Sequence, residues 1–127
     1  MWARETEEAT NARVSFSFQG DERRLTTSIE LALYRIVQEA LSNVARHARA
    51  SQAFLRVSYE TEGLTLQIID NGVGFQVPES PGEFAPSGHF GLLGLYERAE
   101  LIGASLKISS GLGNGTDLTI QLPLQLQ

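Results

Sequence analysis

Hydrophobic residues recur along this chain with two periodicities, one typical of strands and the other typical of helices. The segment Val14-Ser15-Phe16-Ser17-Phe18 alternates apolar and polar residues, which predicts a half-buried strand. Further on, apolar residues recur at steps of three and four, which predicts a long helix that ends near Ala48. Thr26, Thr27 and Ser28 are its candidate caps. Its apolar face is formed by Ile29, Leu33, Ile36, Val37, Ala40, Leu41 and Val44.

A hairpin and a second helix follow the first helix. The predicted strands Ala53–Tyr59 and Leu64–Ile69 are joined by a tight connection at residues 60–63. The second helix is predicted from Leu92 to Ile102 and is stopped by Gly103.

The end of the chain predicts another hairpin, and two further segments flank the main elements. Strands are expected at Ser105–Ser109 and Asp117–Leu122, joined by a glycine-rich turn at residues 111–115. Residues 3–10 read as a short polar helix. Residues 76–90 contain three prolines and two glycines without periodicity, which indicates a functional lid or a disordered segment.

These elements predict an α+β fold in one domain. Two hairpins with interleaved helices imply a two-layer α/β sandwich, in which helices cover one face of a mixed, largely antiparallel sheet. We expect residues 1–127 to form a single domain, with 1–12 as a lead-in helix and 76–90 as a lid loop.

Composition narrows the function classes. The net charge of −5 gives no general electrostatic case for nucleic acid or an anionic membrane surface. The absence of cysteine excludes disulfides and thiolate metal sites, and it fits a reducing, cytoplasmic compartment. No apolar run of these residues is long enough to span a bilayer. A longer parent protein that contains this domain could still be anchored in a membrane elsewhere.

The first helix carries a polar stripe that suits metal and phosphate binding. Glu39 and Asn43 are four residues apart and therefore lie on one face, which Arg46 and His47 extend by another turn. A carboxylate beside a neutral amide oxygen can serve Mg²⁺, which takes few protein ligands and keeps water and phosphate oxygens. Ordinary solvated helix residues explain the same pattern.

The run Asp70-Asn71-Gly72-Val73-Gly74-Phe75 follows the second predicted strand of the first hairpin. A carboxylate at the end of a strand can accept a hydrogen bond from the exocyclic amine of a planar heterocycle. The glycines allow a group to approach the backbone closely. A simple strand-ending turn has the same composition.

Two later glycine motifs are ambiguous when taken singly. Gly91 and Gly94 stand at the start of the second helix, where free N–H groups favour phosphate, although a cap gives the same pattern. Gly113-Asn114-Gly115-Thr116 is most simply a hairpin turn. The two histidines, His47 and His89, are too far apart in sequence to suggest a zinc site.

Taken together and in this order, the four motifs resemble the GHKL superfamily of ATP-binding domains. Glu39-x-x-x-Asn43 resembles its N box and Asp70–Phe75 its G1 box. Gly91-Leu92-Leu93-Gly94-Leu95 and Gly113–Thr116 resemble its later glycine boxes. Residues 34–48 and 94–99 are most similar to the ATP-binding domain of sensor histidine kinases, in the subgroup paired with helix-turn-helix response regulators.

The resemblance implies a role for each motif residue in binding Mg·ATP. Asp70 would receive the adenine amino group, Asn43 would help to hold Mg²⁺, and Glu39 would be the catalytic base and a further Mg²⁺ contact through water. Thr116 would sit beside Asp70. The remaining expected ATP contacts are Arg46, His47, Gly72, Gly74, Gly91, Leu92, Gly94 and Leu95.

The resemblance also implies partners that this sequence does not contain. The phosphoacceptor histidine of such kinases belongs to a helical dimerisation domain, and nothing in the 127 residues resembles it. We therefore expect the acceptor to lie elsewhere in a parent chain or on another chain, with a response regulator downstream. The alternatives are an anti-sigma-factor serine kinase, a gyrase- or chaperone-like conformational ATPase, and a degenerate interaction module.

Overall fold

One mixed sheet and two helices form the part of the chain that the computed structural model describes, which is residues 13–22, 24–43, 51–74 and 90–124. The elements in chain order are β1 (Arg13–Gln19), α2 (Thr27–Asn43), β2 (Gln52–Tyr59), β3 (Gly63–Asp70), α3 (Phe90–Leu101), β4 (Ser105–Ser110) and β5 (Thr116–Pro123). The predicted lead-in helix, the lid and the helix beyond Asn43 lie outside the described residues.

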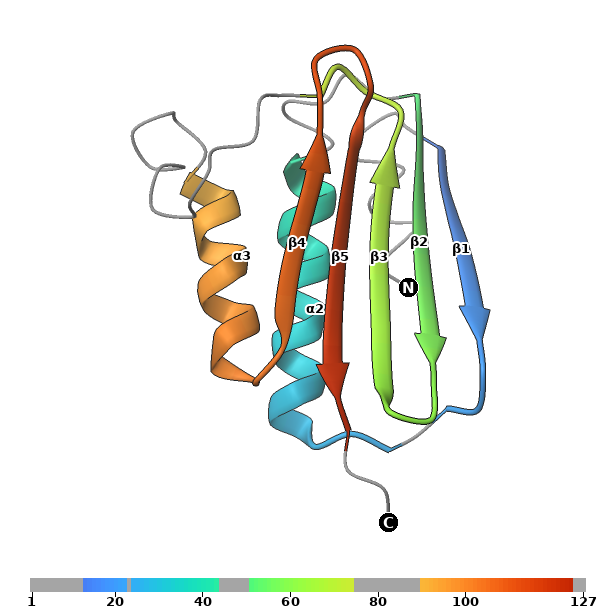
Figure 1. Ribbon diagram of the computed structural model, residues 1–127, viewed down its shortest axis with the longest axis vertical. Coiled ribbons are helices and arrows are strands. Elements are labelled where there is room, and N and C mark those ends of the chain that lie inside the picture. Colours follow the sequence, from blue (N-terminus) through green and yellow to red (C-terminus); the bar gives the residue numbers. More distant parts are fainter. Residues whose placement is uncertain (1–12, 23, 44–50, 75–89, 125–127) are drawn as a thin grey trace.

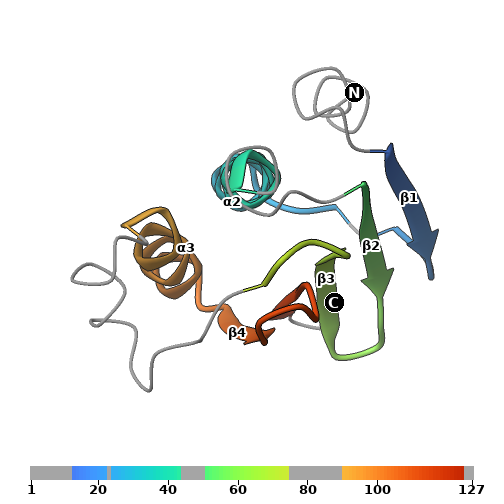
Figure 2. The same ribbon diagram turned by 90° about the horizontal axis from the view of Figure 1, so that it is seen from above.

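The sheet has the strand order β1-β2-β3-β5-β4. Only β1 and β2 are parallel, because α2 crosses over between them, and the remaining neighbours pair antiparallel. Figure 2 shows α2 and α3 on the same face of this sheet. The predicted class, a two-layer sandwich with a largely antiparallel sheet, is confirmed.

Local chemistry fixes where the helices begin and end. Thr26 caps α2, since its Oγ1 accepts the N–H of Ile29 at 3.3 Å, so the first of the three candidate caps is the one used. Gly103 ends α3 with a φ of 76°, and the N–H of Ala104 returns to the Ala99 carbonyl at 2.9 Å. Helix α3 begins at Phe90, two residues earlier than the sequence predicts.

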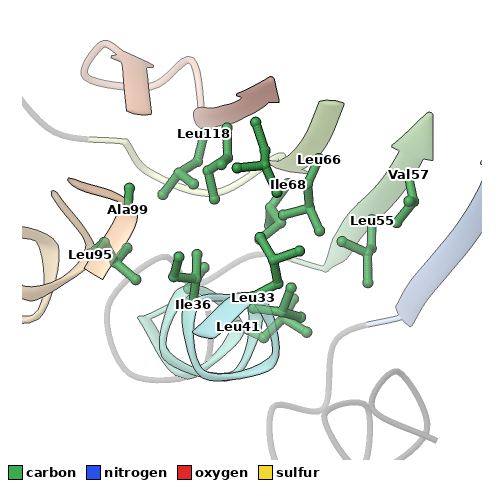
Figure 3. Close-up of a cluster of buried hydrophobic side chains, with 14 of the residues drawn as sticks. Leu33, Ile36, Leu41, Leu55, Val57, Leu66, Ile68, Leu95, Ala99 and Leu118 are labelled. Atoms are coloured by element: carbon green, nitrogen blue, oxygen red, sulfur yellow. The ribbon is translucent and has the colours of Figure 1, made fainter. Parts of the chain in front are cut away.

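The core lies between the helices and the sheet (Figure 3). Side chains from the buried face of α2 meet Leu95 and Ala99 of α3 and the inward-facing residues of β2, β3 and β5. The predicted apolar face of the first helix supplies Leu33, Ile36, Val37, Ala40 and Leu41 to this cluster. This packing holds α2 against the sheet and places the end of the helix at one end of the molecule.

Four segments therefore lie at the same end, uppermost in Figure 1. They are the last two turns of α2, the end of β3, the start of α3 and the turn between β4 and β5. Each carries one of the four motifs recognised in the sequence. The fold thus gathers residues that are up to 77 positions apart between Glu39 and Thr116.

Candidate nucleotide site

Asp70 is the buried carboxylate of this end of the molecule. It is the last residue of β3, it is 8% exposed, and it is the buried charged residue of the described core. Its Oδ1 accepts the backbone N–H of Gly72 at 2.8 Å. Burial raises the pKa of the Asp70 carboxyl above its ordinary value, and hydrogen bonds from the backbone N–H groups of Gly72 and Thr116 oppose that rise. The carboxylate is therefore desolvated and held in a fixed orientation.

The loop after Asp70 packs backbone to backbone against the β4–β5 turn. The N–H of Gly113 donates to the Val73 carbonyl at 2.7 Å. Gly74 has a φ of 66°, and a Cβ on it would lie 2.1 Å from the Gly111 oxygen. Gly115 has a φ of 71°, and a Cβ on it would lie 2.2 Å from the Asp70 oxygen. Glycines of two separate motifs are thus required where the loop and the turn approach each other closely.

Asp70 is the first of three polar residues that stand in a row across neighbouring strands. Thr116 of β5 lies opposite Asp70 on one side and opposite Ser110 of β4 on the other. Directly opposed residues point to the same face of a sheet, so the three side chains share one face. The expected position of Thr116 beside Asp70 agrees with this register.

A cavity of about 280 Å³ opens beside this row. It is lined by Ile69, Asp70, Ser109, Ser110, Gly111, Asn114, Gly115, Thr116 and Asp117. The glycine turn thus supplies one wall of a space that reaches Asp70. The sequence predicted Asp70 and Thr116 here, whereas Ser109 and Ser110 received no role because their placement depends on strand register.

Glu39 and Asn43 lie at the shoulder of the buried face of α2, both partly exposed. Each follows a buried residue, Ile36 or Ala40, by three positions. The Nδ2 atom of Asn43 is buried without a hydrogen-bond partner among the described residues, although Asn43 and Glu39 both make other interactions. Among those residues, no cluster of three His, Cys, Asp or Glu side chains could hold a metal ion. A cation here would depend on Asn43, Glu39 and ligands from a bound phosphate.

The start of α3 carries the third glycine motif. Gly91 and Leu92 are in its first turn, whose backbone N–H groups have no partner within a helix. Gly94 lies in the second turn, and the Leu95 side chain is fully buried in the core. The roles of these four residues remain predictions. Arg46, His47 and the lid lie outside the described residues.

Asn71 is a structural residue of the site that the sequence reading left without a role. Its Oδ1 accepts the N–H groups of Ser51 and Gln52, each at 3.0 Å, and its Nδ2 donates to Ser51 Oγ at 2.9 Å. The N–H of Asn71 also donates to the Gln52 carbonyl at 3.2 Å. These bonds tie the residue after Asp70 to the start of β2. The Asn-Gly pattern alone indicates a turn and not this distant partner.

We expect Asn71→Ala to lower the free energy of unfolding by about 1–2 kcal/mol, because two backbone N–H groups lose their acceptor. Urea unfolding monitored by circular dichroism measures this loss. Asn71→Asp keeps the acceptor oxygens and is expected to retain more stability than Asn71→Ala. Equal stability of Asn71→Ala and the unmodified chain would contradict a role for these bonds.

Comparison with known proteins places these features in one family. Residues 28–126 match the family model described as histidine kinase-, DNA gyrase B-, and HSP90-like ATPase. The chain is 36% identical to the histidine-protein kinase/phosphatase DegS of Bacillus subtilis in an alignment of 125 residues that covers 95% of this chain and 32% of DegS. It is 43% identical to the sensor histidine kinase YhcY of the same species over 101 residues, which are 80% of this chain and 26% of YhcY.

A solved structure has the same fold. The histidine kinase domain of the blue-light activated histidine kinase of Erythrobacter litoralis EL346 superposes with a TM-score of 0.77 at 26% identity. The match covers 96% of this chain and 57% of that domain. The chain spans between about a fifth and a third of the length of these curated relatives.

Proposed function

Since this chain belongs to the histidine kinase-, DNA gyrase B-, and HSP90-like ATPase family, we propose that it is the ATP-binding catalytic domain of a two-component sensor histidine kinase. It binds Mg·ATP at the end of the sheet where the four motifs meet. The γ-phosphate is then transferred to a histidine on a dimerisation domain outside these residues, and from there to a response regulator.

The observation that carries this proposal is the buried, oriented carboxylate of Asp70. Its oxygens are acceptors fixed by two backbone N–H groups, and the cavity beside it is walled by the glycine turn. An exocyclic amino group offers the matching donor, so adenine is favoured over a base with an oxygen at the same position. A hydrogen bond to a charged acceptor in a desolvated site contributes about 1.5–3 kcal/mol.

Glu39 and Asn43 fit a magnesium ion that is brought in by the nucleotide. The pair offers one carboxylate and one neutral amide oxygen, and Mg²⁺ completes its shell with water and phosphate oxygens. When bound, the ion neutralises charge on the phosphates. We propose that Asn43 holds it directly and that Glu39 does so through water.

Positioning is the main contribution of the chain to phosphoryl transfer, since such reactions need little covalent chemistry from the protein. Glu39 accepts the proton or polarises the incoming nucleophile. The start of α3 directs backbone N–H groups of Gly91 and Leu92 toward the phosphates.

The described residues contain no helix with the length and apolar character needed to cross a membrane.

Calorimetric titration of the chain with Mg·ADP and with a non-hydrolysable Mg·ATP analogue tests the proposal. Saturable binding at a one-to-one ratio is expected, and chelating the metal with EDTA should weaken it. Absence of binding with either nucleotide would overturn the proposed function. Rapid turnover of ATP by the isolated chain, rising with dimer formation, would instead identify a conformational ATPase.

Glu39→Gln and Asn43→Ala are expected to separate chemistry from binding. Glu39→Gln should keep nucleotide affinity within about threefold while lowering phosphotransfer by about 10²-fold or more. Asn43→Ala should weaken Mg·ATP binding by about tenfold or more, because the ion loses a direct ligand. Phosphotransfer is followed by radiolabel transfer to a separately supplied, histidine-bearing dimerisation domain. Equal losses of affinity in both variants would contradict the two roles.

A further inference from the structure

The hydroxyl groups of Ser110 and Thr116 form a hydrogen bond whose direction can be deduced. Ser110 Oγ lies 2.8 Å from the Gly115 carbonyl oxygen, which can only accept, so Ser110 donates its one proton there. Ser110 Oγ also lies 3.0 Å from Thr116 Oγ1. With the Ser110 proton already used, Thr116 must be the donor in this second contact. The proton of Thr116 therefore points toward β4 and away from Asp70.

We propose that Ser110 is a specificity-determining positioning residue, which holds the Thr116 hydroxyl as a hydrogen-bond acceptor toward the base of a bound purine nucleotide. The inference rests on the proposed function, because it concerns the base that occupies the site beside Asp70. Ser110 itself acts through Thr116.

The consequence is a pair of acceptors side by side. Thr116 and Asp70 are directly opposed on β5 and β3, which places their Cβ atoms about 5 Å apart. A 6-amino group of a purine carries donors for this pair. A 6-oxo group presents an acceptor to it and is repelled by the carboxylate. A freely rotating Thr116 hydroxyl would donate to the 6-oxo group and would recover part of the lost affinity.

The fixed Thr116 hydroxyl therefore lowers the affinity for a 6-oxo purine more than it raises the affinity for adenine. Discrimination of this kind depends on leaving a competing group without a partner. Hypoxanthine is the appropriate competitor, because it replaces the 6-amino group of adenine with a 6-oxo group and lacks the 2-amino group of guanine. Its additional N1 proton finds the same acceptor oxygens in the unmodified chain and in Ser110→Ala, so it cancels from the comparison of the two proteins.

The experiment compares the affinities for ATP and inosine triphosphate, both with Mg²⁺, in the unmodified chain, Ser110→Ala and Ser110→Thr. We expect Ser110→Ala to lower the ratio of the two affinities by about 3- to 10-fold, mainly through tighter binding of inosine triphosphate. Ser110→Thr keeps a hydroxyl at this position and is expected to restore the ratio. Thermal unfolding of each variant confirms that the chain is folded.

A double-mutant cycle with Thr116→Val separates this role from simple packing. In a Thr116→Val background, Ser110→Ala should leave the ratio unchanged, because the hydroxyl on which it acts is gone. A ratio that does not move in Ser110→Ala, while ATP still binds, overturns the inference and leaves the proposed function intact. If neither nucleotide binds the unmodified chain, the proposed function itself fails.

Discussion

Gly115→Ala is expected to destabilise the chain by about 3 kcal/mol or more, or to prevent folding. Gly115 has a φ of 71°, and an alanine Cβ would lie 2.2 Å from the backbone oxygen of Asp70. The left-handed conformation alone costs a non-glycine residue about 1–2 kcal/mol. The steric overlap adds to this cost, because relief requires β5 to move away from β3 at the point where Asp70 and Thr116 are paired.

Gly113→Ala is the matched control, since it shares the turn but not the overlap. Gly113 has a φ of 82°, and a Cβ on it would meet no atom within 4 Å. We therefore expect Gly113→Ala to lower the free energy of unfolding only by the cost of the left-handed conformation, about 1–2 kcal/mol. Urea unfolding of both variants measures the difference. Equal losses would show that the close approach of Gly115 to Asp70 has no energetic role.

The same two variants also test whether this backbone contact affects nucleotide binding. The Gly115 contact lies directly on the backbone of Asp70, so any shift there moves the carboxylate relative to the cavity. If Gly115→Ala folds, its nucleotide affinity should fall as well, whereas Gly113→Ala should keep most of its affinity. Stability and binding are thus coupled at one backbone contact.

Features that depend on local sequence were predictable from the chain alone. The three- and four-residue steps located α2, and Leu33, Ile36 and Val37 are buried as expected. The alternation in Val14–Phe18 located β1. It did not reveal that β1 is an edge strand or that Phe16 and Phe18 remain 49% and 44% exposed.

Features that depend on strand register were not predictable. The glycine motifs were recognised, but the reason for Gly74 and Gly115 lies in partners 37 and 45 residues away, Gly111 and Asp70 respectively. The role of Ser110 was not predictable for the same reason, since only the pairing of β4 with β5 places it beside Thr116. A pattern of residue types contains no register, so motif residues were found while the residues that support them were missed.

Asp70→Asn is expected to weaken Mg·ATP binding by about 10²-fold. The carboxylate offers acceptors to two backbone N–H groups and, in the proposed function, to the adenine amino group as well. Asparagine loses the charge and presents one N–H₂ group among these donors, which removes about 3 kcal/mol of interaction. Asp21→Asn is the control and should bind normally, because Asp21 is exposed and follows the end of β1, which pairs with the end of β2 far from Asp70. Calorimetry of both variants gives the comparison.

Asp70→Asn should also show how ionisation of Asp70 changes the free energy of unfolding. Because burial raises its pKa, the folded chain holds this proton more tightly than the unfolded chain. The stabilisation from protonated Asp70 is complete below the unfolded pKa and is lost as the pH rises through the raised, folded pKa. The stability of the unmodified chain relative to Asp70→Asn should therefore fall from about pH 3.5 upward until the raised pKa is passed, and then level off. Urea unfolding of both proteins at several pH values measures this difference, in which the titration of the other carboxylates cancels. A difference that rises with pH would mean that the hydrogen bonds from Gly72 and Thr116 outweigh burial, and that the carboxylate is a source of stability in addition to a nucleotide ligand.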